Sequence, residues 1–285
     1  MKIKLQNIHE LSEENNSFEK FASKKRKLSG KQNLNKLVSS DESENMFTSS
    51  DLEALRARGD INGLISIIKT GKEASVYLGK NEEGYLAVKI YTDLRVRSFR
   101  KDSLYRQGRF EGNMRTRKAI DQGSEFGLDA HQILWVNEEF RQMKFLYDKA
   151  IPVPRPIANS GLVILMQLIG NEDNAAERLS DLDLEKQEAE EAFEQSLTIL
   201  KNLIAAGRVH GDFSSYNILW HEEKAILIDF PQVTEIRSNP HAKELLRRDI
   251  ASVFKSFKKY KLDADEEKIF KNLLHIAHRN GHDFV

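Results

Sequence analysis

Two aspartates and one asparagine in the last third of the chain have a spacing that few folds share. The segment 210–219 reads His-Gly-Asp-Phe-Ser-Ser-Tyr-Asn-Ile-Leu, so Asn217 follows Asp212 by five residues. Asp229 comes twelve residues after Asn217, beyond two short apolar runs that predict a strand hairpin. The spacing therefore predicts two neighbouring loops that bring two carboxylates and one amide together beside a hairpin.

This set of side chains fits the chemistry of phosphoryl transfer. One carboxylate must orient the attacking hydroxyl and accept its proton, while a second carboxylate and an amide oxygen hold Mg2+ against the phosphates. Mg2+ prefers such oxygen ligands and keeps water at its other positions. A catalytic loop followed by a metal-binding loop gives the first role to Asp212, and the metal to Asn217 and Asp229.

A second element lies upstream, where a glycine turn precedes a strand lysine. Lys69–Tyr77 lies between two strand-like runs, and Ala87-Val88-Lys89 follows. In ordinary protein kinases a turn with three glycines covers the phosphates and a later strand lysine binds them. Only Gly71 of the three glycines remains here. A lysine flanked by apolar residues on a buried strand needs a partner, which favours a functional role for Lys89.

The composition excludes several other kinds of site. The chain has no cysteine, so disulfides, thiolate nucleophiles and cysteine metal sites are absent. Its 44 basic and 44 acidic residues balance, so the net charge gives no argument for a nucleic-acid partner. No apolar run approaches the roughly 20 residues that span a bilayer, and no signal peptide is recognisable. We therefore expect a cytoplasmic protein without a membrane partner.

The apolar pattern predicts the secondary structure in outline. Short strand-like runs alternate with turns between Ile61 and Tyr91, residues 95–150 favour helices, and Leu162–Leu168 suits a buried strand. Leu182–Ala206 has the period of an amphipathic helix, and Gly207 is placed to end it. Strands followed by helices predict an α+β chain with two lobes and a cleft between them.

The same pattern predicts three parts of the chain. Residues 1–50 are rich in Ser, Asn, Lys and Glu, which predicts a mobile polar tail. Residues 51–168 are expected to form an N-lobe with a nucleotide-binding sheet and a basic insertion. Residues 169–285 are expected to form a C-lobe with the catalytic and metal loops.

Together these motifs resemble the RIO family of atypical serine/threonine protein kinases. The family's phosphate loop, T-G-K-E-A-x-V-Y, is matched by residues 70–77, and its catalytic loop, H-G-D-x-S-x-Y-N-I-L, by residues 210–219. Its metal loop, I-D-x-x-Q, is matched by residues 228–232, and a Leu-Arg-Arg-Asp-Ile helix start by Leu246–Ile250. The resemblance covers roughly residues 60–260. It implies a protein-kinase-like fold with an antiparallel N-lobe sheet, a mainly helical C-lobe and a trimmed activation segment.

The resemblance also implies roles around bound ATP and Mg2+, with Mn2+ as an alternative ion. Lys89 would bind the α and β phosphates and pair with Glu139, with Glu138 as the alternative partner, while Asp212 acts as the catalytic carboxylate. From its place at an expected helix start, Asp249 either braces the catalytic loop or is a plain surface aspartate, and His210 is expected to pack and hydrogen-bond within the loop rather than to act in acid–base chemistry. Further nucleotide contacts are expected from the phosphate loop and the hinge, namely Gly71, Lys72, Ser75, Val76, Met166, Gln167 and Leu168.

The segment 95–118 carries nine basic residues against two acidic ones. In the family that the chain resembles, this position is a flexible loop near the nucleotide that can carry autophosphorylation, which makes Ser98 and Ser103 candidate acceptors. A ribosomal or RNA contact is an alternative, because clustered basic side chains bind phosphates without sequence preference. A solvated helix face is the third interpretation. The stretch Arg97–Gly127 is most similar to the bacterial branch of the family.

Three functions stay open from the sequence. The first is a RIO-type serine/threonine kinase or ATPase, in a family tied to maturation of the small ribosomal subunit. Pro231 replaces the glycine that ordinary kinases place in the metal loop, and no Ala-Pro-Glu follows, so a peptide-docking activation segment is expected to be missing. This favours autophosphorylation, or ATP hydrolysis coupled to a conformational change, over broad phosphorylation of proteins.

The other two functions use the same residues differently. A small-molecule phosphotransferase of the aminoglycoside-kinase type shares the H-G-D-x-x-x-x-N pattern, but only 56 residues follow Asp229 to build an acceptor pocket. A non-catalytic nucleotide-binding assembly factor would not require a complete set of catalytic side chains. Lys89, Asp212, Asn217 and Asp229 are all present, which argues against lost chemistry.

Overall fold

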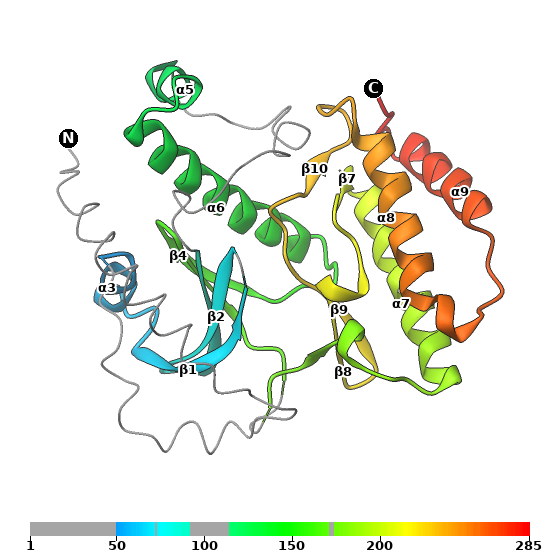
Figure 1. The fold of residues 1–285 in the computed structure, drawn as a ribbon, viewed down its shortest axis with the longest axis horizontal. Helices are drawn as coiled ribbons and strands as arrows, with labels where there is room; N and C mark the ends of the chain where they lie inside the picture. The colour runs from blue at the N-terminus through cyan, green and yellow to red at the C-terminus, as the bar shows by residue number, and fades with distance from the viewer. Residues whose placement is uncertain (1–49, 72, 92–113, 171–173) are drawn as a thin grey trace.

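The structure is a computed structural model that describes residues 50–71, 73–91, 114–170 and 174–285. Figure 1 shows an antiparallel sheet on one side of the molecule, three packed helices on the other, and the long helix α6 (Glu125–Asp148) crossing between them. This is the two-lobed α+β arrangement predicted from the sequence. None of the helices in these ranges combines the length and apolar character that a bilayer crossing requires.

Several sequence predictions lie outside the described residues. They concern the tail before Ser50, most of the basic segment, the phosphate-loop residue Lys72 and the candidate acceptors Ser98 and Ser103. These predictions stay predictions.

The N-terminal sheet forms from the strand-like runs identified in the sequence. Its order is β1-β2-β3-β5-β4, and every neighbouring pair is antiparallel. The Asn81 side-chain oxygen closes the β2–β3 turn, because it accepts hydrogen bonds from the amides of Glu83 and Gly84. The apolar pattern does not predict β4. The strands are β1 (Gly63–Thr70), β2 (Ala74–Asn81), β3 (Gly84–Tyr91), β4 (Pro156–Ser160) and β5 (Val163–Gln167).

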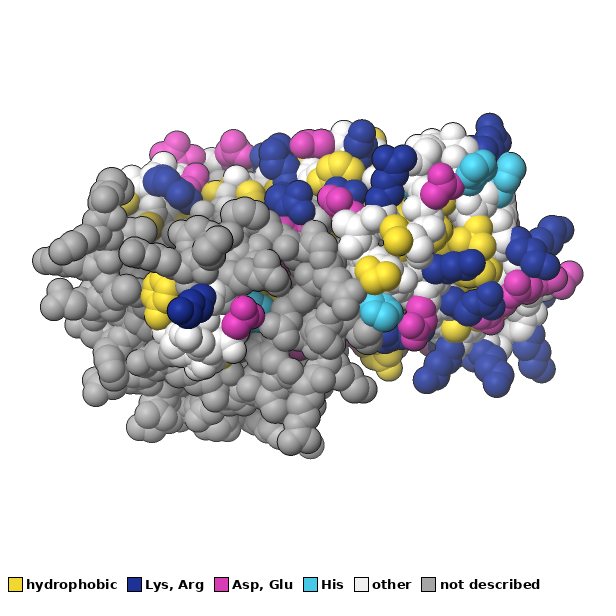
Figure 2. All heavy atoms as spheres, turned by 90° about the horizontal axis from the view of Figure 1, so that it is seen from above, with side chains coloured by type: hydrophobic (Ala, Val, Ile, Leu, Met, Phe, Trp, Pro, Cys, Tyr) yellow, Lys and Arg dark blue, Asp and Glu magenta, His cyan; other side chains and the backbone are white. Residues whose placement is uncertain are grey.

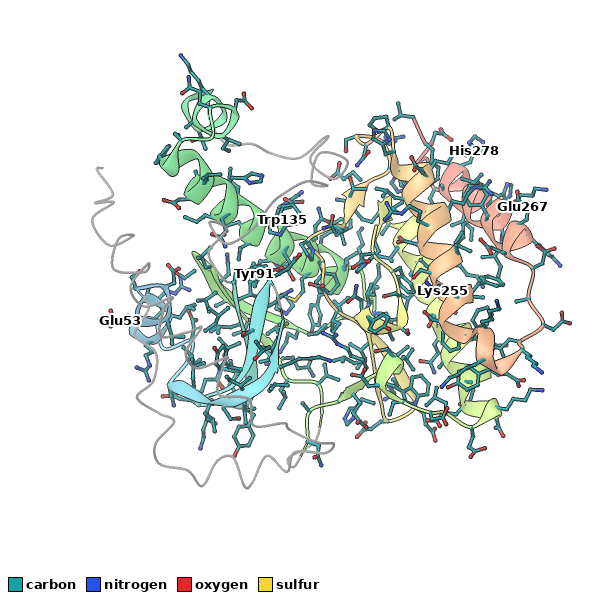
Figure 3. All side chains as sticks on the ribbon, viewed as in Figure 1. Glu53, Tyr91, Trp135, Lys255, Glu267 and His278 are labelled. Carbon is teal, nitrogen blue, oxygen red and sulfur yellow. The ribbon has the colours of Figure 1, made fainter. Side chains whose placement is uncertain are left out.

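Helix α3 (Ser50–Ala57) covers one face of this sheet, although the sequence analysis does not predict it. Leu52 and Leu55 are fully buried in a cluster with apolar residues of the strands. The Asp51 carboxylate accepts a hydrogen bond from the Leu162 amide at 3.0 Å, which ties the helix to the start of β5. Glu53 lies on the outer side of the helix in Figure 3, as an amphipathic surface helix requires.

Helices α5 (Met114–Asp121) and α6 meet at a sharp corner. Ser124 caps α6, because its hydroxyl accepts a hydrogen bond from the Gly127 amide at 3.1 Å. A β-carbon at Gly127 would overlap the carbonyl of Ala119, so only glycine allows the two helices to approach this closely. The helical prediction for residues 95–150 is confirmed over its described part.

The C-terminal lobe combines small sheets with a bundle of helices. The predicted hairpin is confirmed as β8 (Ile218–His221) and β9 (Lys224–Leu227), joined by β6 (Glu177–Arg178). A separate pair consists of β7 (Arg208–Val209) and β10 (Thr234–Glu235). The helices are α7 (Lys186–Ala205), α8 (Ala242–Phe257) and α9 (Glu266–Arg279), with 3-10 turns η3 (Leu179–Asp181), η4 (Ser215–Asn217) and η5 (Lys258–Tyr260).

Two helix boundaries differ from the sequence prediction. Helix α7 begins at Lys186 rather than Leu182, because Leu182 and Leu184 pack on the core from an extended segment and the Leu184 amide donates to the Tyr260 hydroxyl. Helix α8 begins at Ala242, so Leu246–Ile250 lies within it rather than at its start. A turn closed by the Asn239 side chain, which accepts from the His241 amide, starts this helix early.

Charges of both signs mix over the surface visible in Figure 2. Basic side chains gather there around the end of the molecule that α8 and α9 form, with acidic side chains among them. Ion pairs such as Arg247–Glu267 join the two helices. This mixed pattern does not by itself indicate an RNA-binding face in the described part of the chain.

Candidate active site

Lys89 forms ion pairs with two carboxylates, one from its own lobe and one from the other. Its ammonium nitrogen lies 2.6 Å from Glu139 Oε1 and 2.6 Å from Asp229 Oδ1. Lys89 comes from β3, Glu139 from α6, and Asp229 from the loop that follows β9. The predicted pairing with Glu139 is present, whereas Glu138 instead accepts hydrogen bonds from its helix neighbours Arg141 and Gln142.

The labelled side chains of Figure 3 locate this cluster. Tyr91 ends β3 and Trp135 lies on α6, in the middle of the molecule between the sheet and the helical bundle. The Lys89 ammonium lies 5.1 Å from the centre of the Tyr91 ring. The ion pairs are thus formed where the two lobes face each other.

Burial and opposite charges set the ionisation of this cluster. The side chains of Lys89 and Glu139 are 11% and 4% exposed, whereas that of Asp229 is 40% exposed. Burial disfavours the ammonium, but Asp229 and Glu139 outweigh it and raise the pKa of Lys89 above its usual range. Burial raises the pKa of Glu139, and Lys89 offsets only part of that shift. Burial also favours a higher pKa for Asp229. The positive charge and hydrogen bond of Lys89 outweigh this effect, so the pKa of Asp229 is lowered.

The backbone at Asp229 has an unusual conformation that aims its carboxylate at Lys89. Its φ angle is 71°, in the left-handed region that aspartate tolerates better than most residues. The next side chain, Phe230, is only 2% exposed, and its amide lies 3.5 Å from Glu139 Oε1. Such strained conformations persist where surrounding packing fixes them, and they cluster at functional sites.

Asp212 and Asn217 are held together within the catalytic loop. The Asn217 side-chain nitrogen donates to the Asp212 backbone oxygen at 2.8 Å and to its carboxylate at 3.0 Å. Asn217 is buried, whereas Asp212 reaches the surface. Partial burial raises the pKa of Asp212, and the hydrogen bond from Asn217 offsets part of the shift. An accessible carboxylate with a raised pKa suits a group that accepts a proton.

Asp249 braces this loop, as the sequence predicts. Its carboxylate accepts hydrogen bonds from the Gly211 amide at 2.8 Å and the Phe213 amide at 2.9 Å. The residue is 1% exposed and lies in the second turn of α8. Burial raises the pKa of Asp249 to about 7, although the two backbone hydrogen bonds act in the opposite direction.

His210 packs inside the same loop. It is fully buried and makes edge-to-face contacts with Phe213 and Phe230, at ring-centre distances of 5.7 and 6.1 Å. Burial lowers the pKa of His210 to about 4, although the charge of Asp229 opposes the shift. A neutral, buried imidazole agrees with the predicted packing role.

The oxygen atoms near the metal loop fit a Mg2+ ion bound together with a nucleotide. No group of three or more His, Cys, Asp or Glu side chains within the described ranges could enclose an ion by itself. In nucleotide sites Mg2+ is commonly held by one or two protein oxygens plus phosphate oxygens and water. Asn217 turns its amide nitrogen toward Asp212, which leaves its amide oxygen as the ligand atom, and the 40% exposed Asp229 side chain is accessible.

The predicted phosphate loop is the turn between β1 and β2. The Gly71 amide donates to the Ala74 carbonyl at 2.9 Å, and a β-carbon at Gly71 would approach that oxygen to 2.8 Å, so the turn needs glycine. Ser75 is half-buried at the start of β2, and Val76 lies directly across from Lys89 in the β2–β3 ladder. This places the loop next to the lysine, while contact with a phosphate stays a prediction.

The predicted hinge lies at the end of β5. Met166 pairs with Ala87 of β3, and the strand ends at Gln167, whose amide donates to the Arg155 carbonyl. Leu168 begins the connection to the second lobe. Contact of this backbone with an adenine base stays a prediction.

Arg178 belongs to none of the sequence motifs, yet its charge acts on the metal loop. Arg178 lies across from Leu219 in the β6–β8 ladder. Its charge makes a smaller contribution than Lys89 and His210 to the lowered pKa of Asp229. A single arginine in a two-residue strand has no recognisable pattern, because only the pairing with β8 brings it here.

The fold and the site define the class of protein. A strand lysine paired with a helix glutamate, above a catalytic loop and a metal loop in a helical lobe, is the arrangement of protein-kinase-like phosphotransferases. Comparisons with known proteins narrow this class, since a family model of the RIO domain matches residues 75–269. The chain therefore belongs to the RIO family of atypical kinases.

Curated relatives support this assignment. The RIO-type serine/threonine-protein kinase Rio1 of Haloferax volcanii is 33% identical over 219 residues, which cover 75% of this chain and 69% of that protein. The human serine/threonine-protein kinase RIO1 is 33% identical over 199 residues, which cover 69% of this chain but only 33% of its own length. These relatives are archaeal and eukaryotic, and the similarity to a bacterial branch stays a prediction.

Solved structures confirm the predicted fold. The Rio2 kinase of Chaetomium thermophilum, in a complex described as ADP/Mg2+-phosphoaspartate, superposes with a TM-score of 0.60 at 23% identity, over 82% of this chain and 67% of that one. A second structure of the same kinase gives a TM-score of 0.61 at 24% identity. At this identity the likeness concerns the fold.

Proposed function

We propose that the chain binds ATP with Mg2+ and transfers the γ-phosphoryl group to a serine of its own or of a protein partner. The observation that carries this proposal is the Lys89 ammonium, 2.6 Å from both a helix carboxylate and the metal-loop carboxylate. Support also comes from relatives named serine/threonine-protein kinases and from the ADP and Mg2+ of the Rio2 complex.

Each side chain has one role in this reaction. Lys89 contacts the α and β phosphates and is kept charged and oriented by Glu139. Asn217 and Asp229 hold Mg2+, which neutralises charge on the phosphates when it is bound. Asp212 orients the acceptor hydroxyl and accepts its proton, and Asp249 fixes the backbone on both sides of Asp212. Rate enhancement then depends on positioning and electrostatic stabilisation.

The nucleotide lies between the two lobes in this proposal. The β1–β2 turn, with Gly71, Lys72, Ser75 and Val76, covers the phosphates, because Val76 neighbours Lys89. The backbone of Met166–Leu168 faces the adenine, because β5 pairs with β3 and leads into the second lobe. Mn2+ can replace Mg2+ at oxygen ligands of this kind.

Purified protein with ATP labelled at the γ-phosphate tests the proposal. We expect label on the wild-type protein, and a loss of at least about a hundredfold in rate for Asp212→Asn and Asp229→Asn. Asp183→Asn is the matched control, because Asp183 is an exposed aspartate paired with Lys259 on the surface. Full activity of Asp229→Asn would overturn the metal assignment.

The chemical stability of the label identifies the acceptor. A serine phosphate resists hydroxylamine, whereas an acyl phosphate on aspartate is cleaved. The phosphoaspartate of the Rio2 complex makes the second outcome a specific alternative. Label released only as free phosphate would instead favour an ATPase that drives a conformational change. Mapping the labelled residue tests Ser98 and Ser103 directly.

The biological setting of the reaction belongs to the same proposal. We propose a ribosomal or RNA partner for the basic segment 95–118 and a cytoplasmic location on the basis of the sequence and the family alone. Co-sedimentation of the chain with small ribosomal subunits, with and without residues 95–113, would test the first of these.

A further inference from the structure

Arg208 is a buried arginine two residues before His210. Its side chain is 11% exposed, and the β7–β10 ladder places it directly across from Glu235. A buried guanidinium is tolerated only where its N–H groups find partners. Burial lowers the pKa of Arg208, and Glu235 offsets part of this shift. The conformation of Arg208 is therefore set by its neighbours in the protein.

The guanidinium group of Arg208 contacts α6, β10 and the turn before its own strand. Its Nε donates to Gln142 Oε1 of α6 at 3.0 Å, and its terminal nitrogens donate to Glu235 Oε1 at 2.9 Å and to the Gly207 carbonyl at 3.2 Å. The guanidinium carbon also lies 4.1 Å from the centre of the Phe145 ring of α6. One side chain thus links α6 to β7 and β10.

The contact on α6 lies close to Glu139. Gln142 is 1% exposed and follows Glu139 by three residues, so the two side chains lie on the same side of the helix. Its amide nitrogen donates to Glu138 Oε1 at 2.7 Å, and Glu138 accepts two further hydrogen bonds from Arg141. Arg208 therefore holds the turn of α6 that presents Glu139 to Lys89.

The other contacts lie close to the catalytic and metal loops. Arg208 precedes Asp212 by four residues on the strand that leads into the catalytic loop. Glu235 follows Asp229 by six residues on the strand that leaves the metal loop. One guanidinium group thus connects α6 to the strands that border both loops.

We propose that Arg208 is a positioning residue, which fixes α6 against the catalytic and metal loops so that Glu139 reaches Lys89. The inference rests on the proposed function, since it concerns the same site. Arg208 itself touches neither nucleotide nor acceptor and acts through Glu139.

Two substitutions, one at each partner of the Arg208–Gln142 hydrogen bond, test this role. Arg208→Met removes every donor and leaves an apolar side chain beside Phe145, whereas Gln142→Leu removes the acceptor of the Arg208 Nε hydrogen bond together with the Gln142–Glu138 hydrogen bond. We expect each to lower kcat by about tenfold to a hundredfold, because small displacements of catalytic groups have effects of this size. Arg208→Lys, which keeps the charge and a single donor nitrogen, should restore part of the activity.

A double-mutant cycle separates positioning from general destabilisation. In a Glu139→Gln background, Arg208→Met should change kcat by less than about twofold, because both residues act through the Lys89–Glu139 ion pair. Multiplicative losses in the double variant would overturn the proposal. Unchanged kcat in folded Arg208→Met and Gln142→Leu would also overturn it.

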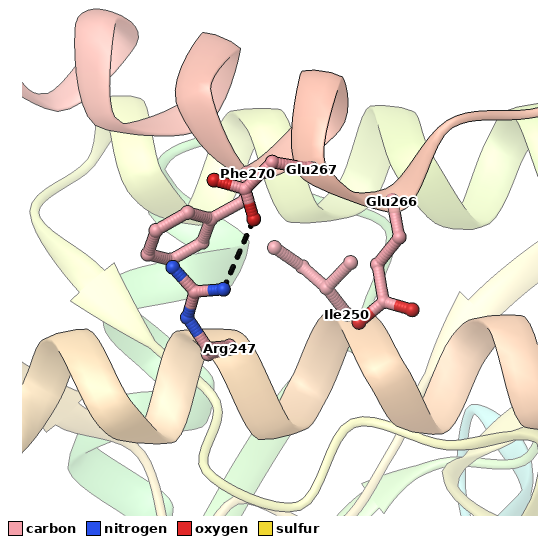
Figure 4. Close-up of a pocket in the computed structure, with 5 residues that line it drawn as sticks. All are labelled: Arg247, Ile250, Glu266, Glu267 and Phe270. Atoms are coloured by element: carbon pink, nitrogen blue, oxygen red, sulfur yellow. Dashed lines mark hydrogen bonds and ion pairs between the residues drawn. The ribbon is translucent and has the colours of Figure 1, made fainter.

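Arg247 supplies a matched control at a distance from the site. Its guanidinium lies 4.0 Å from the centre of the Phe270 ring and 3.0 Å from Glu267, which closely repeats the stacking and ion pair of Arg208. Figure 4 shows this arrangement beside a pocket of about 270 Å³ between α8 and α9. Arg247→Met should leave kcat unchanged.

Hydrogen exchange distinguishes failure of this inference from failure of the proposed function. Arg208→Met should speed amide exchange in α6 and leave α9 unchanged, whether or not the wild-type protein transfers phosphate. An inactive wild type with this exchange pattern would overturn the function and support the positioning role. An active wild type with unchanged exchange in α6 of Arg208→Met would overturn the positioning role alone.

Discussion

His210 lies in the catalytic loop and Asp249 accepts hydrogen bonds from its backbone, and burial shifts the pKa values of the two residues in opposite directions. The pKa of His210 is lowered by burial to about 4, so the unfolded chain binds this proton more readily than the folded chain. The pKa of Asp249 is raised by burial to about 7, so the folded chain binds that proton more readily. On acidification from neutral pH, His210 therefore destabilises the fold while Asp249 stabilises it.

This opposition gives a prediction for two single variants. Relative to wild type, Asp249→Asn should lose stability more steeply as pH falls from about 6.5 to about 4.5, because only the histidine effect remains. His210→Gln should show the reverse trend over the same range. Each difference should reach on the order of 3 kcal/mol at most. Urea unfolding at several pH values measures it, and identical pH profiles in all three proteins would contradict the assignment.

At the scale of elements, the end of α7 determines how the chain enters the catalytic loop. Gly207 follows the helix with a φ angle of 74°, as the sequence predicts for a helix-ending glycine. A β-carbon there would lie 2.8 Å from the His282 ring, so the position is restricted by space as well as by conformation. Arg208 follows directly, which links this turn to the position of α6.

Gly207→Ala should therefore destabilise the fold by more than a conformational effect alone. Gly59→Ala is the matched control, because Gly59 has a similar φ of 78° with nothing within 4 Å of an added β-carbon. We expect about 1 kcal/mol for Gly59→Ala and a clearly larger loss for Gly207→Ala. Thermal and urea unfolding compare the two variants. Equal losses of stability in the two variants would show that the C-terminal segment around His282 moves to accommodate the added methyl group.

For the whole molecule, Lys89 and Asp229 form a direct bridge between the lobes. In the proposed complex, the phosphates take Lys89 as a partner and Mg2+ takes Asp229. Binding of Mg2+ and ATP should then replace the Lys89–Asp229 ion pair with a stronger connection between the lobes, made through the phosphates and the metal ion. Because a ligand that binds only the folded state stabilises it, the melting temperature reports this exchange.

Mg2+ with ATP should raise the Tm of the wild-type chain. At a hundredfold excess over Kd, stabilisation of about 2.7 kcal/mol corresponds to an increase of about 5 to 10 °C. In Asp229→Asn, adding Mg2+ to ATP should give no further increase in Tm. ATP with a chelator should raise the Tm of this variant as much as it raises that of the wild type. Differential scanning fluorimetry measures both. An identical Mg2+ effect in the variant would contradict metal binding at Asp229.

The sequence alone determined those site residues that lie close to one another along the chain. Asp212 and Asn217 lie five residues apart in one loop, and Asp229 is joined to them by a short hairpin, so their proximity follows from covalent connection. Strands β1, β2, β3 and β5 and the long helices of the second lobe also follow from the apolar pattern, whereas β4 does not.

Tertiary structure decided the contacts between distant segments. The Lys89–Glu139 ion pair joins residues 50 positions apart in the sequence. The rotation of α6 about its axis turns Glu139, rather than Glu138, toward Lys89. The two-residue strands that carry Arg178 and Arg208 have no periodicity of their own, since such strands exist only through their partners. The pattern of one segment cannot encode these contacts, because their free energy depends on packing between elements that meet only after the chain has folded.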